Sequence, residues 1–492
     1  MNLDDYASQD GVGLADLIRR REVSQKDVLE ATTEAIARVD PILNFTAELY
    51  QDRIENPLAD LPEGPLAGVP TLLKDFLKYE KGRKSECGCL LFEGNVGSYD
   101  SEVVLRFRAG GMPIIGRSAV PEFGWASSCD TAINGITRNP WDLRAWPGGS
   151  SSGAAVAVAS GALAIAHTSD GGGSTRVPAA YQGLVGMKPT RGRVSDGPGV
   201  ADPNAGMSCH LAVTRTVRDT AAVLDVLSGP AIGDPHLAPV PERPFREEPG
   251  LPVRSMRVAL LLTPPDNAPV APEILAATRD AARLLEDIGH RVEEVAPPFD
   301  GEAMLMAIHT VWTAGMANTI DALARQLGRS PSLQNLTRTT YNTWLDGTRV
   351  SASDYINALG VMNVIRRQLG AFFTGYDLVL SPTTTQLAQL QENQDQEADF
   401  DGLGWTRYMF SPDLFNTVYN ITGNPAISLP LYQTEAGAQI GIQFVGRFAE
   451  DGMLLRLAAA LEQALPWAGR RAPVHVLNDL SEFDRARRGL KG

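Results

Sequence analysis

The sequence predicts an α/β protein, and three observations favour that fold class. Between residues 60 and 225, short apolar runs at 69–73, 113–115 and 163–166 are separated by joints rich in Gly, Pro and Ser. Such runs are typical of buried strands that lead into helices. Residues 256–295 predict a strand–helix–strand crossover, which favours parallel pairing in a sheet. The chain has 492 residues, of which 43% are hydrophobic and 21% charged, the composition of an ordinary globular protein.

The segments outside the glycine-rich region show simpler local patterns. Residues 12–40 predict two amphipathic helices, and Ser24 followed by Asp27 forms a variant of the capping box that begins the second helix. Residues 229–254 contain seven prolines, which predict a linker or an extended surface strap. Residues 386–402 are polar and acidic, so we expect an exposed loop there, with a lid as the alternative.

The second half of the chain carries the crossover that favours a parallel sheet. A strand is expected at 256–262, then a helix that has Pro272 in its first turn and Gly289 after its end, then a strand at 291–295. Two further strands are predicted, at 377–381 and 439–445.

Charge and cysteine content narrow the classes of function. Lys and Arg number 44 against 58 Asp and Glu, a formal net charge of −14, so nucleic acid is not expected as a partner. Four cysteines form neither a disulfide framework nor a zinc cluster, and we expect no metal and no cofactor. The N-terminal residues lack an apolar signal segment, and no run of about 20 apolar residues predicts a membrane span. We therefore expect a cytoplasmic protein with reduced thiols and no membrane partner.

Two glycine–serine stretches are the most unusual local feature. Residues 147–153 read PGGSSSG and lead into a helix of small residues, and residues 169–176 read SDGGGSTR. A helix N-terminus with adjacent hydroxyls stabilises negative charge, and successive glycines let backbone N–H groups point into one concave site, as an oxyanion hole requires. Two tight turns made of hydrophilic residues are the structural alternative.

A nucleophilic serine needs a base, and two types of residue are available. None of the six histidines lies in a recognisable motif. A lysine in apolar surroundings loses its charge because burial disfavours the ammonium form. Lys74 and Lys188 both lie in such surroundings, and the residues alone leave the choice between them open.

A rival motif overlaps the first serine stretch. Residues 149–153 match G-x-S-x-G, the nucleophile elbow of α/β-hydrolases, with Ser151 as nucleophile and His475 as a late histidine. That elbow requires an apolar strand directly before it, and residues 144–148 make a poor strand. An esterase of this type is therefore only a remote alternative.

Taken together, these segments resemble the amidase signature family over nearly the whole chain. The resemblance rests on GVPTLLKD, TRNPWDLRAWPGGSSSGAAVAVA, SDGGGSTRVPAAYQGLVGMKPTRGRVS, YDLVLSPTTT, NITGNPAISLPL and GIQFVGRFAEDGMLLRLAAALE. It implies one domain with a central twisted mixed β-sheet flanked by α-helices on both faces. Within that domain it implies an N-terminal helical segment (1–60), a catalytic core (61–228), a Pro-rich connection (229–255) and a second half (256–492) that completes the sheet and the substrate pocket.

The resemblance also implies the roles of individual residues. Ser174 would be the nucleophile, Ser150 a bridging serine that follows a cis peptide bond after Gly149, and Lys74 the general base. The donors of the oxyanion hole would be the N–H groups of Gly171, Gly172, Gly173 and Ser174. Supporting residues would be Ser151, Asp170 and Arg176. Gly171 stands where the family has a larger residue, so we expect extra space or extra freedom beside the reacting carbonyl, with no donor lost.

The substrate pocket is less well defined by the resemblance. It places Gly124, Trp125, Ala126 and Ser127 near the acyl group. From the second half, the candidates are Met316, Trp312, Trp405 and Phe415, for each of which core packing is the alternative.

The activity implied is hydrolysis of an amide C–N bond through an acyl-enzyme, with a small-molecule amide or carbamate as substrate. The overall run of motifs is similar to bacterial hydrolases of nylon oligomers, aryl amides and urethanes. The alternative is a glutaminase subunit of a tRNA-dependent amidotransferase, which works only with a partner subunit. The resemblance also allows a homodimer.

Overall fold

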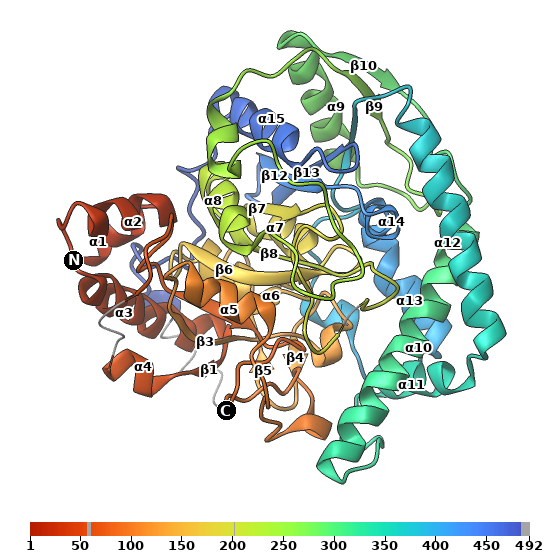
Figure 1. The fold of residues 1–492 in the computed structure, drawn as a ribbon, viewed down its shortest axis with the longest axis horizontal. Coiled ribbons are helices and arrows are strands. Elements are labelled where there is room, and N and C mark those ends of the chain that lie inside the picture. Colours follow the sequence, from red (N-terminus) through yellow and green to blue (C-terminus); the bar gives the residue numbers. More distant parts are fainter. Residues whose placement is uncertain (57–60, 201, 484–492) are drawn as a thin grey trace.

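The computed structural model describes residues 1–56, 61–200 and 202–483, and its centre is an eight-stranded sheet (Figure 1). The strand order is β10-β9-β11-β13-β12-β7-β8-β6. Their bounds are β6 (Ile165–Asp170), β7 (Val185–Lys188), β8 (Cys209–Thr214), β9 (Arg257–Leu260), β10 (Arg291–Glu294), β11 (Leu378–Pro382), β12 (Ala426–Gln433) and β13 (Gln439–Gly446). β9 pairs in parallel with β10 and β11, and the remaining neighbours pair antiparallel. The predicted fold class and the predicted parallel crossover are therefore confirmed.

Alternation along β13 shows that helices cover both faces of the sheet. Ile442 and Phe444 point to the side where α15 (Asp451–Ala464) contributes Leu454 to the same core cluster. Gly441 faces the other side, where a Cβ atom on it would lie 2.4 Å from Ala180 Cβ of α7 (Arg176–Gln182). Successive strand residues point to opposite faces, so the apolar and small residues of β13 serve two different helix layers.

A second, three-stranded sheet brings a lysine to the end of the large one. Its order is β1 (Thr46–Leu49), β3 (Ile114–Ser118), β2 (Thr71–Lys74). β2 lies beside β6, and two hydrogen bonds join them. The Thr71 hydroxyl donates to the Ile165 carbonyl at 3.2 Å. The Lys74 N–H donates to His167 Nδ1 at 3.2 Å. Lys74 at the end of β2 is thereby placed beside the loop that follows β6.

The N-terminal helices form as the sequence predicts. α2 (Gly11–Arg19) and α3 (Gln25–Leu43) are present, and Ser24 and Asp27 make both hydrogen bonds of the capping box. The remaining elements of the first half are α1 (Leu3–Ser8), α4 (Gln51–Glu55), α5 (Glu102–Ala109), β4 (Asp130–Thr131), β5 (Gly135–Ile136), α6 (Ser152–Ala159) and α8 (Val217–Leu227). Short 3-10 turns lie at Leu90–Phe92, Glu122–Gly124 and Phe245–Gly250, the last within the predicted Pro-rich connection.

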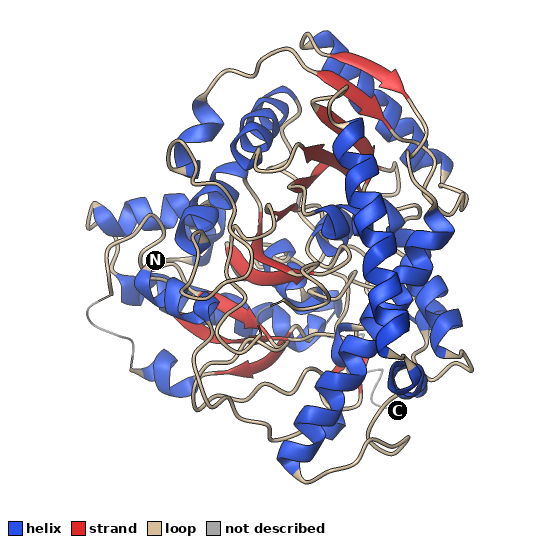
Figure 2. Cartoon of the chain, turned by 45° about the vertical axis from the view of Figure 1, so that its right-hand side comes forward, coloured by secondary structure: helices blue, strands red, loops and turns tan. Residues whose placement is uncertain are grey.

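The second half adds a layer of long helices along one side of the molecule (Figure 2). The sequence analysis predicted only α9 (Pro272–Asp287) among the helices that follow residue 256. The others are α10 (Gly301–Leu327), α11 (Arg338–Arg349), α12 (Ala352–Phe372), α13 (Gly402–Phe410), α14 (Leu414–Thr422) and the α15 given above. Buried side chains of α10, α12, α13 and α14 form a second core cluster with Val379 of β11 and Val445 of β13. Of the helices in the described part of the chain, none is long and apolar enough to cross a membrane.

The polar segment 386–402 is not simply an exposed loop. It contains a 3-10 turn (Gln391–Gln394), and Gln394 and Gln396 are only 2% and 5% exposed. Gln394 Oε1 accepts the N–H groups of Ser127 at 2.6 Å and Ser128 at 2.7 Å. The prediction of an exposed loop is therefore wrong for the middle of the segment, because the Gln394 side chain satisfies buried backbone donors.

Candidate active site

Lys74 is the buried end of β2 and faces two hydroxyls. Its side chain is completely buried, and Nζ lies 2.9 Å from Ser150 Oγ and 2.9 Å from Ser169 Oγ. Burial lowers the pKa of Lys74 to about 7, against the opposing charge of Asp170. A lysine with a pKa near 7 is neutral in about half of the molecules at pH 7, and the neutral amine is able to accept a proton.

Ser150 and Ser151 lie in the turn that starts α6. The Gly149–Ser150 peptide bond is cis, in agreement with the expectation from the resemblance. The Ser151 N–H donates to the Ser174 carbonyl at 3.3 Å, and the Ser151 hydroxyl donates to the Ser169 carbonyl at 3.3 Å. These two hydrogen bonds tie the first serine stretch to the second.

The loop after β6 is organised by the buried Asp170–Arg176 ion pair. Arg176 Nε and Nη2 each donate to the Asp170 carboxylate at 2.9 Å, and both side chains are at most 1% exposed. Burial alone would raise the pKa of Asp170, but the charge and hydrogen bonds of Arg176 hold it well below its usual range. Asp170 also accepts the backbone N–H of Gly173 at 2.8 Å and that of Thr175 at 3.3 Å. The carboxylate therefore fixes the conformation of the loop that carries Ser174.

This arrangement corrects one prediction about the oxyanion hole. The N–H of Gly173 is used by Asp170 Oδ1, so Gly173 is wrong as an oxyanion donor in this structure. Within the described part of the chain, no hydrogen bond uses the N–H groups of Gly171, Gly172 or Ser174. We call these three the open N–H groups, because they have no acceptor among the described residues.

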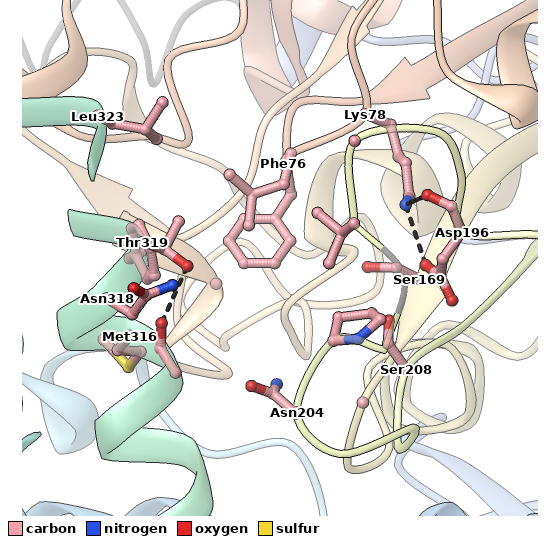
Figure 3. A pocket seen from close by; sticks show the side chains of 18 of the residues that line it. Phe76, Lys78, Ser169, Asp196, Asn204, Ser208, Met316, Asn318, Thr319 and Leu323 are labelled. Atoms are coloured by element: carbon pink, nitrogen blue, oxygen red, sulfur yellow. Dashed lines mark hydrogen bonds and ion pairs between the residues drawn. The ribbon is translucent and has the colours of Figure 1, made fainter. Parts of the chain in front are cut away.

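Ser150, Ser169, Gly171 and Ser174 line a cavity of about 650 Å³. Figure 3 shows side chains of α10 on one side of this cavity, including Met316 and Thr319, and the Lys78–Asp196 ion pair on the opposite side. We call this cavity the chamber. The two glycine–serine stretches therefore meet at the wall of one cavity.

The predicted substrate-pocket residues are divided between the chamber and a neighbouring hollow. Met316 lines the chamber, and Gly124 lines both the chamber and this hollow. Trp125, Ala126 and Ser127 line a separate small hollow that also touches Ser174. Among the weaker candidates, Trp312 lines both spaces. Trp405 is buried and donates from its indole N–H to the Trp125 carbonyl at 3.0 Å, so it packs behind the site, and Phe415 lies in the second core cluster.

The rival candidates for base and nucleophile lie outside the chamber. Lys188 is completely buried at the end of β7 and donates to the Pro189 carbonyl at 2.9 Å. No strand precedes Ser151 in residues 140–151, and His475 packs against Gly161. The nucleophile-elbow alternative is therefore wrong, because the strand that it requires is absent.

Two functional features were missed at the sequence level. Ser169 Oγ is as close to Lys74 Nζ as Ser150 Oγ is. The sequence feature that could have identified Ser169 is its position directly before Asp170. The partners of Arg176 from α14 and β13 were also missed: its guanidinium donates to Asn420 Oδ1 and Gln443 Oε1, each at 2.7 Å. Among the described residues, no group of His, Cys, Asp and Glu could hold a metal ion.

Comparisons with known proteins agree with this architecture. The model of the Amidase family matches residues 27–455. A 6-aminohexanoate-cyclic-dimer hydrolase from Paenarthrobacter ureafaciens is 33% identical over 478 residues, which are 94% of this chain and 96% of that protein. A solved structure of a 6-aminohexanoate cyclic dimer hydrolase complexed with substrate superposes with a TM-score of 0.89 at 32% identity, covering 96% of this chain and all of the other. A bacterial aryl acylamidase of the amidase signature family superposes with a TM-score of 0.83 at 26% identity, covering 94% and 99% of the two chains.

The fold and the matched region define the class of protein: a hydrolase of carbon–nitrogen bonds with a mixed sheet covered by helices. The chain belongs to the amidase signature family and hydrolyses amide C–N bonds.

Proposed function

We propose that this protein is a serine amidase in which Ser174 is the nucleophile, Ser150 the bridging serine and Lys74 the general base. One observation carries the proposal: Lys74 Nζ lies 2.9 Å from Ser150 Oγ, and Ser150 and Ser174 line the same chamber. Burial keeps the pKa of Lys74 at about 7, so the amine is available as a base without a histidine.

The proposed reaction has two stages. Ser174 Oγ attacks the amide carbonyl carbon while its proton passes to Ser150 and the Ser150 proton passes to the neutral Lys74 amine. The oxyanion is stabilised by the N–H groups of Gly171, Gly172 and Ser174. The protons return through the same path to the leaving nitrogen, and the C–N bond breaks to leave an acyl-enzyme. A water molecule then attacks the ester with the same proton relay and releases the acid and free Ser174.

The supporting residues hold this geometry without taking up or releasing a proton themselves. Asp170 fixes the turn through the Gly173 N–H, and Arg176 fixes Asp170. Ser151 joins the two serine stretches through the Ser174 and Ser169 carbonyls. Ser169 holds Lys74 Nζ at the distance of a hydrogen bond, which orients the amine toward Ser150.

For the substrate we propose a small uncharged amide, with a carbamate as the chemically related option, because both present a carbonyl carbon bonded to nitrogen. The cyclic-dimer hydrolase and the aryl acylamidase support this choice by name. The chamber of about 650 Å³ supports it by size, since small-molecule sites commonly measure about 300–1,000 Å³.

We further propose one domain, a cytoplasmic location and no metal or organic cofactor. Strands from residues 165–214 and from residues 257–446 share one sheet, which supports the single domain. The boundary at residue 60 falls outside the described residues. Four buried free cysteines support a reducing compartment. The homodimer and the absence of nucleic-acid and membrane partners stay predictions.

The test is a product screen by mass spectrometry on the purified chain, with Ser174→Ala beside it. The panel holds an anilide, a short aliphatic amide, linear and cyclic 6-aminohexanoate oligomers, an aryl carbamate and glutamine. We expect the wild type to cleave at least one of the amides and Ser174→Ala to lose about 10³-fold or more of that rate. The exposed Ser330→Ala is the matched control and should keep the wild-type rate.

The outcomes separate the proposal from its alternative. Wild-type-like hydrolysis by Ser174→Ala would exclude Ser174 as the nucleophile. Activity on glutamine alone, or only after a partner protein is added, would favour the amidotransferase subunit instead.

A further inference from the structure

Two hollows of very different size meet at Ser174. The chamber measures about 650 Å³, whereas the second hollow, on the side of Trp125 and Ser127, measures about 10 Å³. A space of that size holds about one water molecule. An amide has one group on each side of its carbonyl, so a site of this shape treats the two halves of the substrate unequally.

Trp312 separates the two hollows, because it is the aromatic side chain that lines both of them. It projects from α10 and stacks on Trp125 with ring centroids 5.4 Å apart and planes at 30°. Phe410, from the end of α13, meets Trp312 edge-on at 5.3 Å and Trp125 edge-on at 5.8 Å. We call these three residues the aromatic wall. Each ring is held by the other two, so the wall is a packed unit and not a single mobile side chain.

The aromatic wall rests directly on the loop that carries the open N–H groups. A Cβ atom built on Gly171 would lie 2.9 Å from Trp312 Cη2, and one on Gly172 would lie 2.7 Å from Phe410 Cε1. The expectation that Gly171 leaves extra space beside the carbonyl is therefore wrong. The ring of Trp312 occupies the volume that a larger residue at position 171 would take.

The chamber on the other side of Trp312 offers apolar surface with few free charges. Phe76, Val311, Met316 and Leu323 line it. Its Lys78 and Asp196 are paired at 2.9 Å, and its Asp202 lies 2.9 Å from His236 Nε2. Figure 3 shows the α10 side chains across the chamber from this ion pair. An extended and largely uncharged group fits such a space, because burying an unpaired charge there would be costly.

We propose that Trp312 is a specificity-determining residue that restricts one half of the substrate to a short group, while the chamber accepts an extended apolar half. The substrate class is then an asymmetric amide or carbamate, compact on one side of the carbonyl and long on the other. This inference rests on the proposed function, because it assumes that hydrolysis takes place at Ser174.

The test compares two substrate series on wild type, Trp312→Ala and Trp312→Phe. One series lengthens the acyl half of an anilide from acetyl through butanoyl to octanoyl, and the other lengthens the amine half of an acetamide over the same range. We expect wild-type kcat/KM to fall about tenfold or more along one series only. Trp312→Ala should reduce that fall by about tenfold, and Trp312→Phe should lie between the two. Thermal unfolding of each variant checks that it is folded.

A matched tryptophan provides the control. Trp344 of α11 donates to Asp321 at 2.9 Å and lines neither hollow, so Trp344→Ala should keep the wild-type length profile. A folded Trp312→Ala that hydrolyses amides with the wild-type profile would overturn the inference, as would a wild type that tolerates long groups in both series. A wild type that cleaves no amide at all is a different result, because it overturns the proposed function itself.

A second measurement tests the contact with the loop. The methyl group of Gly171→Ala meets Trp312, so this variant should lose several-fold in kcat/KM in the wild-type background. In the Trp312→Ala background the methyl group meets open space, and the loss should largely disappear. Equal losses in both backgrounds would show that the two positions are not coupled.

Discussion

The loop region around Ser174 and the helical side of the chamber are built in opposite ways. In the loop region, the buried Arg176 guanidinium donates to the Asp170 carboxylate, to Asn420 and to Gln443, and Asp170 in turn holds the backbone of Gly173. On the helical side, Trp312 and Met316 are placed by apolar packing within the second core cluster. One region is fixed by directional hydrogen bonds and the other by shape.

This difference predicts that the two regions affect different kinetic parameters. Directional hydrogen bonds hold atoms to fractions of an ångström, which the transfer of a proton and the stabilisation of an oxyanion require. Packed apolar side chains set volume and contact area, which decide the ligand that fits. Changes in the loop region should therefore act on kcat, and changes on the helical side should act on KM and on selectivity.

The largest expected effect on the rate comes from replacing one of two equally buried lysines, Lys74, with Lys188 as the control. Lys74→Met removes the proposed base, and we expect kcat/KM to fall about 10³-fold, within the range for general base catalysis. Lys188 is equally buried but donates to the Pro189 carbonyl outside the chamber, so Lys188→Met should stay within about threefold of wild type per folded molecule. Both variants are measured with the best substrate of the product screen, after circular dichroism has shown that they are folded.

The opposite results would assign the general base to Lys188 instead of Lys74. A large loss in folded Lys188→Met together with near-normal rates in Lys74→Met would move the base from β2 to β7. A large loss in both variants would show that buried positive charge near Asp170 matters more than proton transfer.

The next largest effect is the dependence of the rate on pH. Burial lowers the pKa of Lys74 to about 7, and the base must be neutral to act. Well below that pKa each pH unit removes about tenfold of the neutral amine, so kcat/KM should fall about 50-fold between pH 7 and pH 5 and level off above about pH 8. His210 also lines the chamber, but burial lowers its pKa to about 4, so it does not titrate in this window.

The measurement is kcat/KM across this pH range, under conditions where chemistry limits the rate. In His210→Gln the fall of kcat/KM at acid pH should have the same midpoint as in the wild type, because protonation of Lys74 causes that fall. A flat profile from about pH 5 to pH 9 would count against a lysine base.

The loop region around Ser174 was largely predictable from the sequence because its signal is local. The serine stretches, Asp170 and the buried lysine each lie within short motifs, and β6 and α6 form where the apolar runs predict them. The strand expected at 69–73 forms as Thr71–Lys74, a shift that places Lys74 inside the strand instead of after it. The use of the Gly173 N–H was not predictable, since a glycine motif does not show which amide faces a carboxylate.

The helical side was not predictable because its features depend on contacts between distant segments. Trp312 acquires its position from Trp125, Phe410 and Gly171, which come from three other parts of the chain. The same holds for Gln394, whose amide completes the hydrogen bonding of Ser127 and Ser128. Helix periodicity alone does not separate a cavity-lining side chain from one in the core.

The smallest expected effect tests the helical side with two buried methionines. Met316 of α10 lines the chamber, whereas Met362 of α12 is buried in the same core cluster and lines no part of the chamber. Met316→Ala removes apolar contact with the substrate, so KM should rise about three- to tenfold with kcat nearly unchanged. Met362→Ala should lower the thermal unfolding temperature by creating a cavity and leave KM at its wild-type value. If Met316→Ala instead lowered kcat as Lys74→Met does, the helical side would take part in chemistry, and the division between directional hydrogen bonds and shape would not hold.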